Sequence, residues 1–157
     1  MTRQSYLSYA LILLAAGCYL TSLLLPGIVY HPNHDPSLDP SRLGTVDSGT
    51  DILAMGWAGI FVGNIAWYAN IVFAVAVVLA LDGRMVRTAA VLGLVAFAMG
   101  IDALDFTVKP LDESGSHEML VDRLAIGFYV WETALAIFAL SQFIEVMRRR
   151  QSAPIPP

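Results

Sequence analysis

The sequence GWAGIFVGNIAWYAN, residues 56–70, lies inside a long apolar segment and combines small residues with two tryptophans and two asparagines. At a helical period its small residues, spaced by three and four, form one seam. This seam consists of Gly56, Gly59, Gly63, Ala66 and Asn70. A neighbouring row consists of Trp57, Ile60, Asn64, Trp67 and Ile71. We therefore expect a helix that another helix approaches closely along one side.

The whole chain is more apolar than an ordinary soluble domain. Of its 157 residues, 57% are hydrophobic and 14% are charged, whereas about a quarter of the residues in a soluble domain are charged. A helix of about 20 apolar residues crosses a bilayer core, and four segments are long enough: 6–30, 53–81, 86–106 and 124–147. We predict an all-α membrane protein in which residues 1–150 form one antiparallel bundle of four transmembrane helices. Residues 151–157 are predicted to be a disordered tail.

Basic residues are distributed unequally between the two ends of the predicted bundle. The two termini and the second loop share one side, which carries Arg3, Arg84, Arg87, Arg148, Arg149 and Arg150. The other side carries Arg42, Lys109 and Arg123. Because Lys and Arg are retained in the cytoplasm, we predict cytoplasmic termini, with loops 31–51 and 107–122 outside. The outer loops are acidic, which argues against nucleic acid as a partner.

The third predicted span carries a second row of small residues at helical spacing. This row consists of Ala89, Gly93, Ala96, Gly100 and Ala103. In lipid, close backbone approach through small residues favours helix association. Since only a short turn at residues 82–84 separates the second and third spans, we predict that these two helices pack seam to seam.

Polar side chains within the predicted spans form the first candidate site. They are Asn64, Trp67, Asn70, Asp102, Asp105 and Glu132. At 1.5 Å per residue, Asn64 and Glu132 lie at similar depth, about 12 Å from the outer ends, so their side chains can meet. One interpretation is an outward-facing site for a proton, a cation or a polar head group, with Glu132 as its central carboxylate. The other is that Glu132 only holds the bundle together.

The outer loops contain a candidate metal site. Its residues are His31, His34, Asp35 and His117. A proline after the first histidine favours an extended segment with three residues per turn, which brings His31 and His34 to the same side. Two histidines and a carboxylate suit zinc or copper, but an ordinary solvated loop has the same composition. No other cofactor is predicted, and with one cysteine the chain forms no internal disulfide.

Short motifs occur in the first, second and fourth predicted spans and in the loop before the fourth. They are Leu25–Pro26, Gly56–Trp57, the segment 67–70, Asp112–Glu113 with Gly115, and Gly127 with Tyr129 and Trp131. Together they resemble a family of small four-span bacterial inner-membrane proteins of unknown function. The resemblance covers the whole bundle and implies a multi-pass protein of the bacterial cytoplasmic membrane. It implies no activity. Independently of it, Trp57, Tyr129 and Trp131 are expected to belong to an aromatic belt at the outer interface.

The spans leave no room for a separate catalytic domain, which favours a non-enzymatic protein that binds a partner through its outer face. An accessory subunit or an immunity-type protein fits this description, with membrane lipids and another membrane or secreted protein as partners. The alternative is a small transporter or channel component that uses Glu132. It would have to be a homo-oligomer, because four helices are too few to enclose a path. A metal- or lipid-dependent membrane enzyme is the third interpretation.

Overall fold

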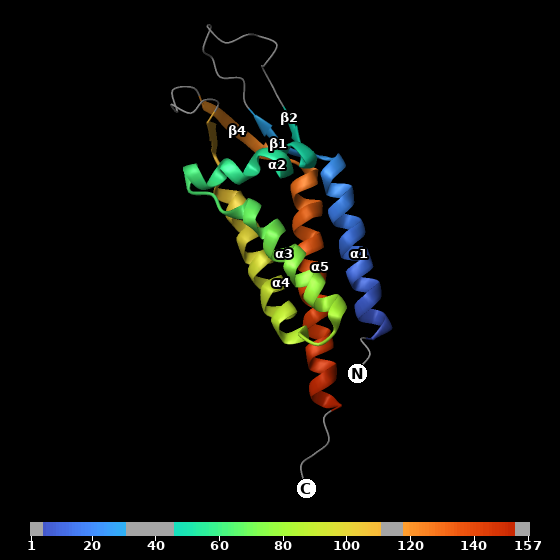
Figure 1. The fold of residues 1–157 in the computed structure, drawn as a ribbon. Coiled ribbons are helices and arrows are strands. Elements are labelled where there is room, and N and C mark those ends of the chain that lie inside the picture. The colour runs from blue at the N-terminus through green and yellow to red at the C-terminus, as the bar shows by residue number, and fades with distance from the viewer. Residues whose placement is uncertain (1–4, 31–45, 111–117, 153–157) are drawn as a thin grey trace.

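The computed structural model describes residues 5–30, 46–110 and 118–152 (Figure 1). Four helices form a bundle: α1 (Tyr6–Leu24), α3 (Ala69–Asp82), α4 (Val86–Ile101) and α5 (Ile126–Gln151). Helix α5 contacts both α1 and α4, and α3 packs against α4. Within the described residues, three helices are long and apolar enough to cross a membrane: Tyr6–Leu24, Val86–Asp105 and Ile126–Gln151. The apolar helix Ala66–Asp82 is shorter. The predicted mostly helical fold is thus confirmed, and three of its helices could span a membrane by their length and composition.

The predicted second span is not one helix. Within residues 49–82 the chain forms α2 (Gly49–Met55), the 3₁₀ helix η2 (Gly56–Val62), the short 3₁₀ turn η3 (Ala66–Tyr68) and then α3. Gly63 ends η2 with φ of +80°, a left-handed conformation that glycine adopts without steric cost. Helix α2 and η2 consequently lie across the end of the bundle (Figure 1). The predicted seam over 56–70 is wrong, because its glycines lower helix propensity and allow the chain to turn.

A small antiparallel sheet, which the sequence did not predict, covers the same end of the bundle. Its strands are β1 (Pro26–Tyr30), β2 (Val46–Ser48), β3 (Val108–Pro110) and β4 (Glu118–Leu124), in the order β2-β1-β4-β3. The first span therefore ends at Leu24, because the residue before Pro26 disfavours helix. We call the sheet together with α2 and η2 the cap. The termini of the described chain and the α3–α4 turn lie at the opposite end (Figure 1).

The small-residue row of α4 packs against α5 and not against a seam on the second span. Gly93 and Gly100 are both buried. A Cβ atom on Gly93 would meet the ring of Phe138, and one on Gly100 would meet the carboxylate of Glu132. The row is buried as its composition predicts, and α3 and α4 do pack against each other, but the glycines of the row face α5 and not the predicted seam. Helix α3 instead buries a face with a different set of residues: Ala69, Phe73, Ala76 and Ala80.

The interface between α1 and α5 was not anticipated. Helix α1 buries Ser8, Ala15 and Ser22, which are seven residues apart and so lie on one face. At the end of the bundle opposite the cap, the fully buried Glu145 of α5 accepts a hydrogen bond from the Ser5 amide at 3.3 Å. It also pairs with Arg149 at 2.8 Å. These contacts tie the beginning of α1 to the end of α5.

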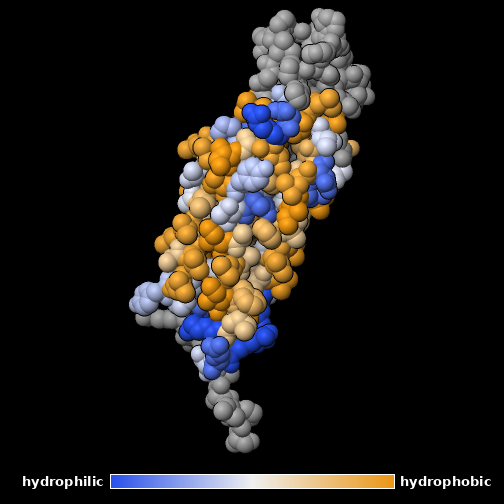
Figure 2. All heavy atoms as spheres, turned by 180° about the vertical axis from the view of Figure 1, so that it is seen from behind, coloured by the Kyte–Doolittle hydropathy of each residue, from blue (hydrophilic) through white to orange (hydrophobic). Residues whose placement is uncertain are grey.

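The surface of the bundle is apolar where lipid would contact it. Figure 2 shows a face that is mostly hydrophobic along the bundle, with hydrophilic residues towards both of its ends. Large exposed apolar side chains are found on all four helices of the bundle, among them Leu13 of α1, Val78 of α3 and Phe143 of α5. Helices that are apolar on their outer as well as their inner faces are typical of a membrane environment.

Candidate functional site

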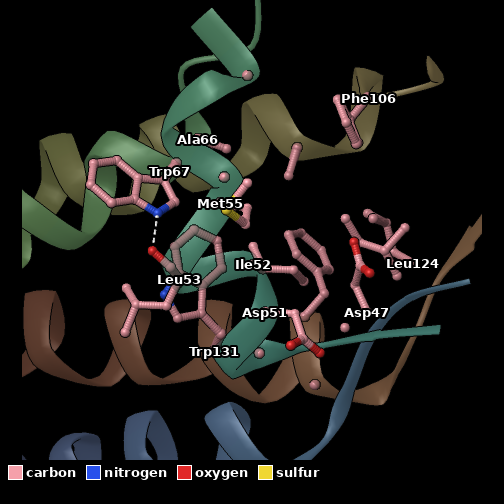
Figure 3. Close-up of a pocket in the computed structure, with 18 of the residues that line it drawn as sticks. Asp47, Asp51, Ile52, Leu53, Met55, Ala66, Trp67, Phe106, Leu124 and Trp131 are labelled. Atoms are coloured by element: carbon pink, nitrogen blue, oxygen red, sulfur yellow. Dashed lines mark hydrogen bonds between the residues drawn. The ribbon is translucent and has the colours of Figure 1, made fainter. Parts of the chain in front are cut away.

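A cavity of about 220 Å³ lies between the cap and the adjoining ends of the helices (Figure 3). The roof comes from α2 and η2, with Ile52, Met55, Gly56, Ala58 and Gly59. The sheet side comes from Gly27, Ile28, Tyr30, Asp47 and Leu124. The floor comes from the bundle, with Ala66, Trp67, Asn70, Ala103, Phe128 and Trp131. Most of these side chains are aliphatic or aromatic, so the cavity is predominantly apolar.

The roof of the cavity is stabilised by a capping box at the start of α2 and by a hydrogen bond from the indole of Trp67 in the floor. Ser48 and Asp51 form a capping box at the start of α2: the Asp51 amide donates to the Ser48 hydroxyl, and the Ser48 amide donates to the Asp51 carboxylate at 3.0 Å. The indole N–H of Trp67 donates to the carbonyl of Leu53 at 2.9 Å (Figure 3). A Cβ on Gly56 would contact the same indole ring. The roof therefore packs closely on Trp67.

Asn70 organises the floor of the cavity. Its Oδ1 atom accepts hydrogen bonds from the Tyr19 hydroxyl and the Trp131 indole, each at 2.9 Å. Its Nδ2 atom donates to the carbonyl of Trp67 at 2.8 Å. One amide thus joins α1, α3 and α5. Trp131 was expected in an aromatic belt, but its N–H points into this network.

Asn64 and Asp102 fix the turn between η2 and η3. Asn64 Nδ2 donates to the backbone carbonyl of Asp102 at 2.9 Å, and the amide of Ile65 donates to the Asp102 carboxylate at 2.7 Å. Asn64 Oδ1 accepts from the amide of Ala66 at 3.2 Å. The two residues grouped from sequence do meet, and their hydrogen bonds anchor a turn on the end of α4. Asp105 lies at the end of η4 (Asp102–Asp105) with an exposed side chain.

Glu132 is separate from this group. Both of its carboxylate oxygens are buried and have no hydrogen-bond partner among the described residues. They lie against Gly100, whose missing side chain provides the space. The expected contact with Asn64 is not made, because the Asn64 amide is bonded to Asp102 and Ala66. Glu132 is thus a buried carboxyl group at the α4–α5 interface.

Tyr30 and Asp47 form the polar edge of the cavity in the sheet. The buried Tyr30 donates its hydroxyl hydrogen to Asp47 Oδ2 at 2.8 Å. Burial, followed by the hydrogen bond and the charge of Asp47, raises the pKa of Tyr30 above its ordinary value. This bond joins β1 to β2, so it stabilises the side of the cap from which α2 begins.

The candidate metal ligands His31, His34, Asp35 and His117 lie outside the described residues. In the parts of the chain that the structure does describe, no group of three or more histidine, cysteine, aspartate or glutamate residues is placed to hold a metal.

Sequence reasoning missed Glu145. The signal was its position three and four residues before Arg148 and Arg149, a spacing that places all three side chains on one helix face.

Comparisons with models of protein families, with curated proteins and with solved structures find no significant match to this chain. Its function must therefore be inferred from the geometry described above.

Proposed function

We propose that this chain is a non-enzymatic integral membrane protein that binds a partner protein through its cap. The observation that supports this proposal is the cap itself. Four strands and α2 form an ordered structure beyond the apolar part of the bundle, and crossing a membrane does not require them. An accessory subunit or an immunity-type protein needs such a platform on the outer face.

The proposed placement has four membrane crossings with both termini in the cytoplasm. At 1.5 Å per residue, the helix Ala66–Asp82 spans about 25 Å, close to the thickness of a thinner bilayer core. The α3–α4 turn and the two ends of the described chain lie at one end of the bundle (Figure 1). Arg84, Arg87 and the segment 148–150 give that end its positive charge, which favours the cytoplasmic side. The bacterial cytoplasmic membrane is the location that the family resemblance implies.

Reporter fusions test this placement. A cytoplasmic reporter inserted after Gly83 or joined after Ser152 should be active, and a reporter that works only outside the cytoplasm should be inactive at both positions. The opposite pattern at both positions would reverse the proposed orientation. Reporter activities that place the two positions on opposite sides of the membrane would exclude four crossings, because α4 and α5 would then not both cross it.

The cap offers two features that suit a protein partner. The strand order places β2 and β3 at the edges of the sheet, the positions at which a partner strand can add by backbone hydrogen bonding. Strand β4 exposes the apolar Leu120 next to the charged pair Asp122 and Arg123, whose ion pair measures 3.0 Å. An apolar residue surrounded by charges is a common arrangement at protein interfaces.

Site-specific photocrosslinking in native membranes tests the partner. A photoreactive amino acid at Leu120 should yield one discrete adduct that mass spectrometry identifies as a protein. The control position is Val78 on α3, which is also exposed but lies on the bundle surface; it should yield only lipid adducts. Absence of a protein adduct at Leu120, or the same adducts at both positions, would refute the proposed role of the cap.

A second candidate function is a small oligomeric transporter or channel component that uses Glu132. It is favoured by the two buried carboxylate oxygens that lack a hydrogen-bond partner among the described residues, because intramembrane carboxyl groups commonly carry protons or bind cations. In proteoliposomes with a trapped pH dye, Glu132→Gln should abolish proton uptake while Asp105→Asn retains it. Equal uptake by the two variants and the unmodified protein would exclude this function.

A further inference from the structure

The roof of the cavity lies where the bundle meets the cap, and it has two different sides. The cavity side of η2 carries the small residues Gly56, Ala58 and Gly59. Its other side carries large apolar residues, of which Phe61 is 79% exposed and Trp57 is 46% exposed. A segment that lies across a helix bundle and exposes a tryptophan and other large apolar side chains is typical of the membrane interface.

The polar side chains that line the cavity have hydrogen-bond partners within the protein, including the Asp47 and Asp51 carboxylates, which accept from the Tyr30 hydroxyl and the Ser48 amide. The indole N–H groups of Trp67 and Trp131 donate to Leu53 and Asn70, respectively. The Asn70 amide uses both its oxygen and its nitrogen in bonds within the bundle. The aromatic faces and aliphatic side chains that remain can contact an apolar ligand but offer few hydrogen bonds to a polar one.

The size of the cavity also favours an apolar occupant. At about 220 Å³ it is larger than the engineered apolar cavity of roughly 150 Å³ that binds small hydrocarbons. An ordered water molecule needs two to four polar partners, and an empty cavity destabilises the fold in proportion to its volume. In the proposed placement, lipid chains are the most abundant apolar molecules beside η2.

We propose that this cavity binds one hydrocarbon chain of a phospholipid from the outer leaflet. The chain lies between η2 and the floor formed by Trp67, Trp131 and Phe128, and η2 separates it from the surrounding lipid. The inference rests on the membrane placement proposed above and is independent of the partner protein. Lipid binding by the purified chain can therefore fail while the crosslinking result stands, and the reverse also holds.

The three tryptophans provide a direct test. Trp57 is exposed, whereas Trp67 and Trp131 both line the cavity. In a Trp57→Phe background, fluorescence therefore reports on the cavity. Titration of detergent-solubilised protein with a phospholipid brominated on its acyl chain should quench this fluorescence saturably, at about one lipid per chain. Quenching that rises linearly with lipid, or equal quenching by a brominated detergent, would overturn the proposal.

Cavity-filling variants complete the test. Ala58→Phe and Ala103→Phe place a ring in the cavity from opposite sides and should each weaken saturable quenching at least tenfold. The matched control is Ala74→Phe, since Ala74 is exposed on α3 and does not line the cavity; it should bind like the parent. Native mass spectrometry should show one retained phospholipid in the parent and control only. If either correctly folded cavity variant binds normally, or if the parent retains no lipid, the proposal is wrong.

Discussion

The indole N–H of Trp131 in α5 donates a hydrogen bond of 2.9 Å to Oδ1 of Asn70 in α3. The same oxygen accepts the hydroxyl hydrogen of Tyr19 in α1. In a membrane, helices gain little from burying apolar surface against each other, so such interhelical hydrogen bonds and close packing have a larger share in stability. The cavity thus has a floor whose geometry depends on one amide.

Asn70→Ala should destabilise the bundle more than the loss of any one of its bonds. The substitution leaves the Trp131 indole, the Tyr19 hydroxyl and the Trp67 carbonyl without their partner, at a combined cost of about 2 kcal/mol. Tyr19→Phe, which removes one bond, should cost about 0.6 kcal/mol. Unfolding in mixed micelles with increasing denaturing detergent measures both. Equal destabilisation by the two variants would contradict the central role of Asn70.

Gly100→Ala should destabilise the α4–α5 interface by about 1–3 kcal/mol, because the added methyl group overlaps the Glu132 carboxylate. In a Glu132→Ala background the cost should fall nearly to zero, since the obstructing atoms are gone. Gly17→Ala is the control: a Cβ there meets nothing within 4 Å, and alanine favours helix. A double-mutant cycle by thermal unfolding in detergent measures the coupling, and additive effects would disprove the contact.

Glu145→Gln should weaken the end of the bundle that carries the termini by about 1–3 kcal/mol. Glu145 is buried and pairs with Arg148 and Arg149, and Arg149 also donates to the carbonyl of Gly83 at 2.8 Å. The variant should therefore increase hydrogen exchange at the start of α1 and at the α3–α4 turn. Arg150→Gln, at an exposed position on the same helix, should change neither region. If hydrogen exchange at these two regions is the same in Glu145→Gln and Arg150→Gln, Glu145 does not hold them together.

The stability of the cap should fall at alkaline pH because of Tyr30. Its pKa is raised in the folded protein by burial and by the bond to Asp47, so the unfolded chain releases the proton first as the pH rises. The contribution of Tyr30 is complete below its ordinary pKa near 10 and is lost progressively above it. Tyr30→Phe should flatten this alkaline decline, measured by thermal unfolding between pH 8 and about 11.

The control for this measurement is Tyr6→Phe, because Tyr6 is 92% exposed and lies on α1, away from the cap. It should keep the alkaline decline of the unmodified protein. If Tyr6→Phe and Tyr30→Phe flatten the curve equally, the decline does not arise at the cap.

The sequence by itself determined the apolar helices and the buried row on α4. Length and hydropathy are properties of continuous segments, so α1, α4 and α5 are readable from composition alone. The tight turn at Asp82–Gly83 could be predicted because glycine is the residue preferred where a turn needs a positive φ. In the structure Gly83 has φ of +70°. The Gly93 and Gly100 row was readable because small residues at helical spacing indicate close packing.

Only the tertiary structure decided the cap, the break in the second apolar segment and the partners of each polar group. The strands pair residues far apart in the chain, and no local period reports such pairing. In the segment 56–70, the same glycines suit either a helix seam or a turn, and the bonds from Asn64 and Ile65 to Asp102 on another helix select the turn. Asn70 and Glu132 are polar residues in apolar surroundings, whereas Glu145 lies beside Arg148 and Arg149. Their different roles depend on which groups the neighbouring helices place within hydrogen-bonding distance.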